Sequence, residues 1–230
     1  MSFFRFPHTP HIIWLGEGVP RDDKVLTPSE VNGLLAGEVV VEEKLDGANL
    51  GISVSDEGKL RTQNRGQYLV EPYDGQFKEL SSWLKNREES LFESLGDKLI
   101  LFGEWCAARH SLAYDRLADF FIVFDVYDRQ SKRFWSSARR NELAKRLDLK
   151  VVPEVFKGKA TVASLKKLLQ SHTSAFRIGP MEGVVVRRES GDWLDERAKL
   201  VRPDFTQSID EHWRSRKIEW NRVDWNYPSK

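Results

Sequence analysis

The sequence contains one cysteine, Cys106, and no apolar stretch approaching the ~18 residues that would span a bilayer. A single cysteine cannot form an internal disulfide, and the five histidines follow no Cys/His pattern with zinc spacing. The first residues lack the basic start and the long apolar run of a signal peptide. These absences predict a cytoplasmic protein that does not act at a membrane.

An excess of charge of one sign is missing as well. The chain carries 36 lysines and arginines against 35 aspartates and glutamates, so its composition alone does not indicate a nucleic-acid-binding protein. Basic residues gather only locally, between Arg129 and Arg146 and again between Arg214 and Arg222. The second group is interleaved with tryptophans, and such a segment either docks on the body of the protein or stacks on RNA bases.

The 230 residues are enough for one large domain, and their periodicity predicts an α+β fold of antiparallel sheets flanked by helices. We predict strands at 38–43, 50–54, 60–65, 99–102, 120–127, 184–186 and 199–201. We predict helices at 76–95, 138–147, 162–170 and 210–221. Residues 1–37 are expected to form extended segments and turns. The whole chain, 1–230, is expected to be a single domain in which 206–230 forms a short helical and aromatic tail.

The first chemical lead is the tetrapeptide Lys44-Leu45-Asp46-Gly47, which follows the valine-rich segment 38–43. A lysine at the end of a strand can project into a pocket, where desolvation and nearby cations lower its pKa from ~10.4 and make the amine a nucleophile. The glycine permits a sharp turn directly afterwards. The alternative is a surface lysine beside a hairpin turn, and the tetrapeptide alone does not separate the two.

Five further motifs follow the tetrapeptide, and the six together resemble the covalent nucleotidyltransferase superfamily of polynucleotide ligases and mRNA capping enzymes. The tetrapeptide resembles motif I, and Gln63-Asn64-Arg65-Gly66 resembles motif Ia. Motif III is matched by Phe102-Gly103-Glu104-Trp105, and motif IIIa by Phe121-Ile122-Val123-Phe124-Asp125. Motif IV is matched by Glu182-Gly183-Val184-Val185-Val186-Arg187, and motif V by Ala198-Lys199-Leu200-Val201. The match spans residues 38–202 and keeps the family's order, so joint occurrence by chance has a very low probability.

Within this superfamily the sequence is most similar to ATP-dependent RNA ligases of the small bacterial and phage type. The tract from Arg109 to Asp115 and the opening residues 7–11 carry that resemblance. Only 31 residues follow Lys199, too few for the OB domain that follows the catalytic domain in DNA ligases and capping enzymes, and motif VI is absent. The resemblance therefore implies the adenylyltransferase fold of DNA ligase catalytic domains, which is similar to ATP-grasp, without a C-terminal OB domain.

The resemblance also implies a reaction with three nucleotidyl transfers. A lysine attacks the α-phosphorus of ATP and expels pyrophosphate, the AMP passes to a 5′-phosphate end, and a 3′-hydroxyl then displaces the AMP. The expected cofactors are ATP, held as covalent AMP on Lys44, and Mg²⁺ or Mn²⁺. Because each transfer builds negative charge on phosphate oxygens, cationic side chains are expected to dominate catalysis.

The resemblance assigns roles to the motif residues. The expected catalytic residues are Lys44, Asp46, Arg65, Glu182 and Lys199. The residues expected to bind the nucleotide are Glu42, Glu43, Lys44, Arg65, Glu104, Phe124, Glu182 and Lys199. Phe124 would stack on the adenine, Glu104 would accept hydrogen bonds from a ribose hydroxyl, and the backbone near Glu42 and Glu43 would read the adenine edge. Asp46 and Glu182 are the expected metal ligands, directly or through water.

Motif V departs from the family pattern of two lysines separated by one residue. Lys199 matches the first lysine, whereas Val201 occupies the second position. Arg202 would point to the opposite face of a strand. Arg187 or Arg188 is a candidate for the missing positive charge.

The leading interpretation is an RNA ligase that joins 3′-OH and 5′-phosphate ends, in a nicked duplex or between single strands, with RNA repair as its expected role. A kinase or phosphatase that heals RNA ends would be a fitting partner, and a monomer is favoured although the sequence leaves the oligomeric state open. Three alternatives also remain open: a small DNA ligase, a capping guanylyltransferase, and a non-catalytic module that binds RNA or a nucleotide.

Overall fold

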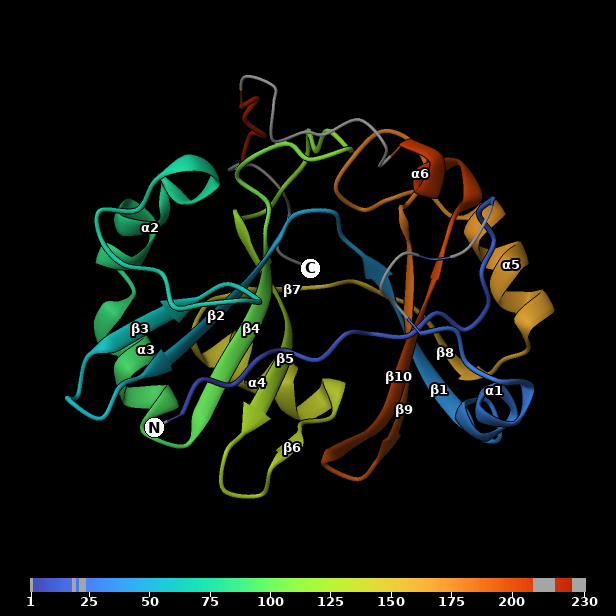
Figure 1. Cartoon of the computed structure of the whole chain (residues 1–230), viewed down its shortest axis with the longest axis horizontal. Coiled ribbons are helices and arrows are strands. Elements are labelled where there is room, and N and C mark those ends of the chain that lie inside the picture. Colours follow the sequence, from blue (N-terminus) through green and yellow to red (C-terminus); the bar gives the residue numbers. More distant parts are fainter. Residues whose placement is uncertain (1, 18–19, 21–23, 209–217, 225–230) are drawn as a thin grey trace.

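The structure is a computed structural model that describes residues 2–17, 20, 24–208 and 218–224. The described part contains a four-stranded and a six-stranded β-sheet that stand side by side, with helices on their outer faces (Figure 1). All strand pairs in these two sheets are antiparallel except one between two neighbouring strands of the larger sheet. This architecture confirms the predicted α+β class of antiparallel sheets flanked by helices.

The four-stranded sheet has the order β10-β9-β1-β8. Its strands are β1 (Glu38–Lys44), β8 (Glu154–Lys159), β9 (Gly183–Ser190) and β10 (Trp193–Val201). Helices α1 (Pro28–Leu34) and α5 (Val162–Ser171) pack on this sheet and share one apolar core with it. Val39 and Val41 of the central strand lie in this core because alternate residues of a strand point to the same face.

The six-stranded sheet has the order β3-β2-β4-β5-β6, with β7 pairing in parallel with β5. Its strands are β2 (Ala48–Val54), β3 (Leu60–Gln63), β4 (Leu99–Trp105), β5 (Phe121–Asp128), β6 (Arg133–Phe134) and β7 (Lys150–Val151). The helices beside it are η1 (Gly75–Phe77), α2 (Leu80–Lys85), α3 (Glu88–Leu95) and α4 (Ser137–Arg146). Leu50, Ile52 and Val54 of β2 are buried in the core shared with these helices, as their alternation predicted.

The chain crosses from one sheet to the other between Lys44, which ends β1, and Ala48, which begins β2. The chain bends at Gly47, as expected, without a positive φ at this residue. A Cβ atom there would lie 2.6 Å from the carbonyl oxygen of Trp105. The glycine is therefore required because the link packs directly against β4.

Two helix predictions are wrong. Residues 28–34 form helix α1, which begins with the capping box of Thr27 and Glu30 and a proline at its first position; we expected only extended segments and turns there. The single helix predicted at 76–95 is three shorter elements, η1, α2 and α3, although α3 does end at Gly96. Each short helix turns its own apolar side chains, such as Trp83 and Leu91, into the core.

The remaining predicted elements are confirmed in kind and differ in length. The strand predicted at 99–102 continues to Trp105 in β4, so Glu104 lies within a strand. Strands β6, β7 and β8 were not predicted, because β6 and β7 have only two residues and β8 lacks a strong apolar alternation. The helix predicted at 210–221 lies mostly outside the described residues; its last part, 218–221, is not helical.

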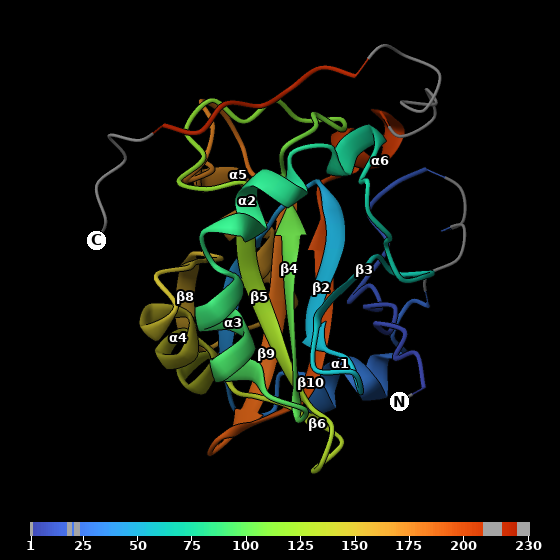
Figure 2. The same ribbon diagram turned by 90° about the vertical axis from the view of Figure 1, so that its left-hand side faces the viewer.

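The N-terminal segment of the described chain contacts both sheets, and its last segment lies on the loop between β4 and β5. In the N-terminal segment, the Phe4 carbonyl accepts a hydrogen bond from Gln63 Nε2, and Ile12 N donates to the Lys199 carbonyl. Residues 218–224 follow helix α6 (Pro203–Ser208) in sequence and pass over the loop between β4 and β5 (Figure 2). Among the described helices, none has the length and apolar character needed to cross a membrane.

Candidate functional site

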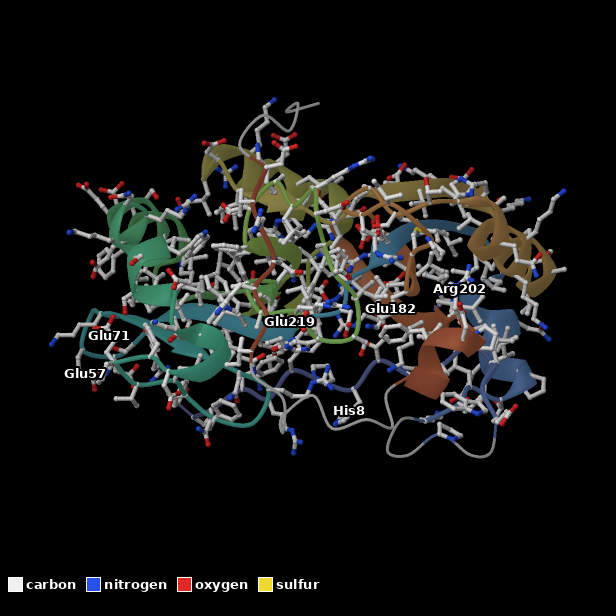
Figure 3. The ribbon with its side chains drawn as sticks, turned by 90° about the horizontal axis from the view of Figure 1, so that it is seen from above. His8, Glu57, Glu71, Glu182, Arg202 and Glu219 are labelled. Carbon is white, nitrogen blue, oxygen red and sulfur yellow. The ribbon has the colours of Figure 1, made fainter. Side chains whose placement is uncertain are left out.

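A cavity of about 730 Å³ lies between the two sheets. Seven of the nine predicted site residues line it: Glu42, Glu43, Lys44, Arg65, Glu104, Phe124 and Lys199. The other two, Asp46 and Glu182, lie directly behind Lys44. The view from above shows Glu182 near the middle of the molecule, while Glu57 and Glu71 lie at its outer edge (Figure 3). Six separate segments therefore bring the predicted residues to one place.

Lys44 lies at the centre of a group of carboxylates. Its Nζ is 2.5 Å from Glu182 Oε1 and donates to the Leu45 carbonyl at 3.2 Å. Strand pairing explains the contact with Glu182, because Lys44 of β1 is opposite Gly183 of β9. The Lys44 side chain is 25% exposed, whereas that of Glu182 is only 4% exposed, so the amine faces the cavity and the carboxylate lies behind it.

Two further carboxylates surround the same lysine. Glu104 Oε1 accepts a hydrogen bond of 2.9 Å from Gly47 N, which ties β4 to the link between the sheets. Asp46 Oδ2 accepts hydrogen bonds from the backbone amides of Ser111 and Leu112 at 2.7 and 3.0 Å. The tract 109–115, which carried the likeness to RNA ligases, thus holds the carboxylate of motif I.

The protein groups around Lys44 favour its charged form. Burial lowers the pKa of Lys44, but Glu182, Glu104 and Asp46 outweigh burial and raise the pKa above its usual value. Burial raises the pKa of Glu182 to about 8 and that of Glu104 to about 7, with Lys44 opposing both shifts. The cations expected to lower the pKa of Lys44 are therefore not these neighbouring side chains, and activation of the amine by a bound metal ion stays a prediction.

The cluster of carboxylates around Lys44 is suited to bind a divalent cation. Glu182 Oε2 is buried and has no hydrogen-bond partner, which is costly for a carboxylate oxygen unless a proton or a cation meets it. Hard oxygen donors of this kind suit Mg²⁺ and Mn²⁺. Within the described ranges, no three His, Cys, Asp or Glu side chains form a complete metal site by themselves. The remaining ligands of a cation here would have to be phosphate oxygens or water.

Arg65 reaches the cavity from a turn after β3. Asn64 Oδ1 accepts the amides of Gly66 and Gln67 at 2.8 and 2.9 Å, which fixes this turn. Arg65 Nε is buried without a hydrogen-bond partner. A guanidinium with an unsatisfied donor at the cavity wall is suited to bind an anionic group such as a phosphate.

Phe124 lines the cavity because β5 contains a β-bulge. Phe102 pairs with Asp125 and Gly103 pairs with Val123, so Phe124 is the extra residue between them. Its carbonyl accepts a hydrogen bond of 2.7 Å from Arg140 Nη1 instead of joining the ladder. The ring is partly exposed, which leaves a face available for a flat ligand.

A buried ionic network forms the wall behind Phe124. It consists of three arginines and three carboxylates: Arg140, Arg187, Arg197, Glu42, Asp125 and Glu189. Arg187 is 2.8 Å from Asp125 and 2.7 Å from Glu189, and the Arg140–Glu42 distance is 2.6 Å. The network joins β1, β9 and β10 of one sheet to β5 and α4 of the other.

The carboxylates of Glu42 and Glu43 are both engaged with the protein. Glu42 belongs to the ionic network, and Glu43 Oε2 accepts the amide of Ala175 at 2.9 Å. The amide of Glu43 donates to the Pro153 carbonyl. Recognition of adenine by this backbone therefore stays a prediction, and the side chains have structural contacts.

The face of β10 that reaches the cavity carries two cations. Lys199 lines the cavity, and so does Arg197, which is two residues earlier and hence on the same face. Val201 is buried. Arg188 pairs with Glu196 and lies away from the cavity, whereas Arg187 lines the cavity within the ionic network. The second cation of this strand thus precedes Lys199 instead of following it.

Sequence reasoning missed several residues of the cavity wall. They include Phe6, Thr9, Asn49, Gln76, His110, Val185 and Arg197. Of these, Arg197 was within reach, because the two-residue period of a strand places it beside Lys199. His110 Nε2 lies 2.7 Å from Gln76 Oε1 and forms a hydrogen bond with it. Cys106 is buried, and burial raises the pKa of its thiol, in agreement with an inert packing role.

Comparison with known proteins gives one family match and several similar structures. Residues 37–201 match the family model for RNA ligases. No curated protein matches the chain in sequence.

The similar structures are of the Naegleria gruberi RNA ligase. Its structure with PPi has 18% identity and a TM-score of 0.62, covering 90% of this chain and 64% of that one. A mutant with ATP and Mn has 19% identity and a TM-score of 0.57, covering 78% and 54%. Another mutant, with AMP and Mn, has 19% identity and a TM-score of 0.58, covering 80% and 54%. This chain therefore spans little more than half of those proteins, and the likeness establishes the fold.

Proposed function

Because the chain belongs to the RNA ligase family, we propose that it is an ATP-dependent ligase that adenylylates itself on Lys44 and seals RNA ends. The observation that carries this proposal is the position of the Lys44 amine at the cavity, 2.5 Å from the buried Glu182 and surrounded by Glu104 and Asp46. A lysine in that setting has both access to a nucleotide and neighbours that control its proton.

The first role of the carboxylates is to set the protonation state of the Lys44 amine. Glu182, Glu104 and Asp46 favour the ammonium form of Lys44. A divalent cation held by Glu182 and Asp46 would neutralise carboxylate charge and the charge of the leaving pyrophosphate. Lys44 would then lose its proton to water, and its amine would form the bond to the α-phosphorus of ATP as the bond to pyrophosphate breaks.

The cationic side chains act on the phosphates. Lys199, on the cavity face of β10, would stabilise the negative charge that develops at the α-phosphate. Arg65, with its unsatisfied Nε, would bind the 5′-phosphate of the RNA end that receives the AMP. Arg197 is tied to Asp125 and lies 4.4 Å from the Phe6 ring, so its contribution is to the shape and charge of the wall.

The nucleoside would lie between the two sheets. The Phe124 ring offers a stacking surface for adenine, and Glu104 lies close enough to Lys44 to accept a hydrogen bond from the ribose. The backbone at Glu42 and Glu43 is the nearest group able to distinguish ATP from GTP. ATP with Mn and AMP with Mn are the ligands named for the Naegleria ligase, which supports the same nucleotide and a divalent metal here.

The substrate that we propose is RNA with 3′-OH and 5′-phosphate ends, in a nick or between single strands. RNA repair in the cytoplasm, action as a monomer and cooperation with an end-healing kinase or phosphatase belong to the same proposal. These assignments follow the resemblance of the motifs and the tract 109–115 to RNA ligases.

The proposal is tested by incubation with α-labelled ATP and Mg²⁺, followed by denaturation. Label should remain on the wild-type chain and be lost in Lys44→Ala, because only the amine can form the phosphoramidate. Lys59→Ala, an exposed lysine of the β2–β3 turn, should label like the wild type. Absence of label on the wild type would leave a nucleotide-binding module as the better description.

A second assay separates RNA from DNA as the substrate. Matched nicks with a ribose or a deoxyribose at the 3′-OH side are sealed in parallel with the purified protein. Faster sealing of the ribose end is the expected result. Faster sealing of the deoxyribose end would favour a small DNA ligase, and labelling by GTP instead of ATP would favour a capping enzyme.

A further inference from the structure

Residues 218–224, here called the C-terminal strap, lie across the loop that follows β4. Backbone hydrogen bonds of 2.8 to 2.9 Å run from Arg109 N to Glu219 O, from Asn221 N to Ala107 O and from Asp224 N to Leu117 O. Figure 2 shows this segment passing above the strand ends, and Figure 3 places Glu219 over the middle of the molecule. The strap therefore lies on residues 106–117 through two isolated β-bridges, Trp220 with Ala108 and Val223 with Leu117.

Asn221 is the buried residue of the strap. Both polar atoms of its side chain form hydrogen bonds. Oδ1 accepts a hydrogen bond from the amide of Tyr114 at 2.9 Å, and Nδ2 donates to the carbonyls of Cys106 at 2.8 Å and Ala108 at 3.4 Å. The residue is 7% exposed, whereas its neighbour Trp220 is 43% exposed. One amide thus closes both ends of the loop from 106 to 114.

That loop in turn holds the motif with the proposed nucleophile. The Tyr114 hydroxyl accepts the backbone amide of Asp46 at 2.7 Å, and the amides of Ser111 and Leu112 bind the Asp46 carboxylate. Tyr114 is buried in the apolar cluster that also contains Leu45 and Cys106. A continuous set of hydrogen bonds therefore leads from Asn221 through Tyr114 to Asp46, two residues from Lys44.

We propose that Asn221 is a positioning residue for self-adenylylation, which acts through Tyr114 and Asp46 and contacts no substrate. This inference rests on the proposed ligase function. Asp46 has one carboxylate oxygen committed to the loop, so the position of the loop decides where its other oxygen and the adjacent Lys44 lie. Small displacements of such groups have large effects on rate, up to about 100-fold per ångström.

The test is a double-mutant cycle on the single-turnover rate of label transfer to Lys44 at saturating ATP. Asn221→Ala removes the three side-chain hydrogen bonds, and Tyr114→Phe removes only the acceptor for Asp46 N while keeping the ring. Each variant should lower the rate by about tenfold or more, and the double variant should be no slower than the slower single one. Urea denaturation of each variant shows that the proteins compared are folded.

Trp220→Ala is the matched control, because it truncates an exposed side chain of the same strap; its rate should stay within about twofold of the wild type. If Asn221→Ala does not fold, Tyr114→Phe decides, since it leaves the strap intact. Multiplying effects in the double variant, or normal rates in folded single variants, would overturn the inference. Absence of label on the wild type would instead refute the ligase function itself.

Discussion

Two groups of charged side chains border the cavity, and they are built in opposite ways. The ionic network behind Phe124 has three arginines and three carboxylates, and it is almost completely enclosed. The group around Lys44 has one lysine against three carboxylates, and Glu182 Oε2 has no partner. The first group is balanced without a ligand, whereas the second is balanced only when protons or an added cation neutralise its carboxylates.

Within one cavity, the ionic network has a structural role and the group around Lys44 has a chemical role. Burial lowers the pKa of Arg187, but Asp125, Glu42 and Glu189 outweigh burial and raise it, so Arg187 keeps its charge at every physiological pH. In the Lys44 group, burial raises the pKa of Glu182 to about 8 and that of Glu104 to about 7, so its charges change near neutral pH. Groups that must exchange protons and ligands are the ones left unbalanced.

Removing an arginine from the ionic network should have the largest effect, and this effect is on the stability of the protein. Arg187→Met leaves Asp125 and Glu189 buried beside too little positive charge, and it should destabilise the protein by about 3–5 kcal/mol. Urea denaturation measures this change. Arg188→Met is the matched control on the neighbouring position, whose ion pair with Glu196 is more exposed, and it should cost less than about 1 kcal/mol. Equal losses in both variants would contradict the assignment of the network to stability.

Removing a carboxylate from the unbalanced group should instead affect activity. Glu182→Gln keeps the shape of the side chain but withdraws the charge that meets Lys44 and the cation. The single-turnover rate of adenylylation should fall on the order of 100-fold, equivalent to about 2.7 kcal/mol, with the free energy of unfolding changed by less than about 1 kcal/mol. A loss of stability without a loss of rate would place Glu182 among the structural charges.

The pH dependence of stability sharpens the comparison. Burial raises the folded-state pKa of Glu104 to about 7 from 4.5, so the folded protein holds a proton that the unfolded chain releases. This carboxyl therefore makes the protein less stable as the pH rises from about 4.5 to 7. Glu104→Gln, which can still accept from Gly47 N, should equal the wild type near pH 4 and exceed it by about 3 kcal/mol at pH 8. Denaturant midpoints at both pH values measure the difference, and a constant difference would refute the shifted pKa.

The smallest effect is expected at Phe124, which lies between the two groups. Phe124→Leu retains an apolar side chain but removes the flat face, and the KM for ATP should rise about fivefold, equivalent to about 1 kcal/mol. Phe92→Leu makes the same change at an exposed position of α3 and should leave KM unchanged. An unchanged KM in Phe124→Leu would assign this ring to packing alone.

The sequence was sufficient for the residues that act within a contiguous motif. Lys44, Glu104, Phe124 and Lys199 were predicted from short strings of residues, and the structure brings them to one cavity. The helix at 28–34 was also encoded locally, in the capping box of Thr27 and Glu30, although its signal was overlooked.

What could not be predicted depends on pairing between distant segments. The contact of Lys44 with Glu182 requires the register between β1 and β9, and no local pattern specifies that register. The ionic network draws on β1, β5, α4, β9 and β10, so its balance of charge is invisible in any one stretch of sequence. The three carboxylates that raise the pKa of Lys44 were unforeseen for the same reason.

The link at residues 45–47, where the chain passes from one sheet to the other, has a consequence for the integrity of the cavity. Lys44 and Lys199 belong to the four-stranded sheet, whereas Glu104 and Phe124 belong to the six-stranded sheet. The other strands of the four-stranded sheet, β8, β9 and β10, all follow the link in sequence. Proteolytic nicking at the link would therefore leave Lys44 covalently separate from every other strand of both sheets, held in the cavity only by the pairing of β1 with β8 and β9.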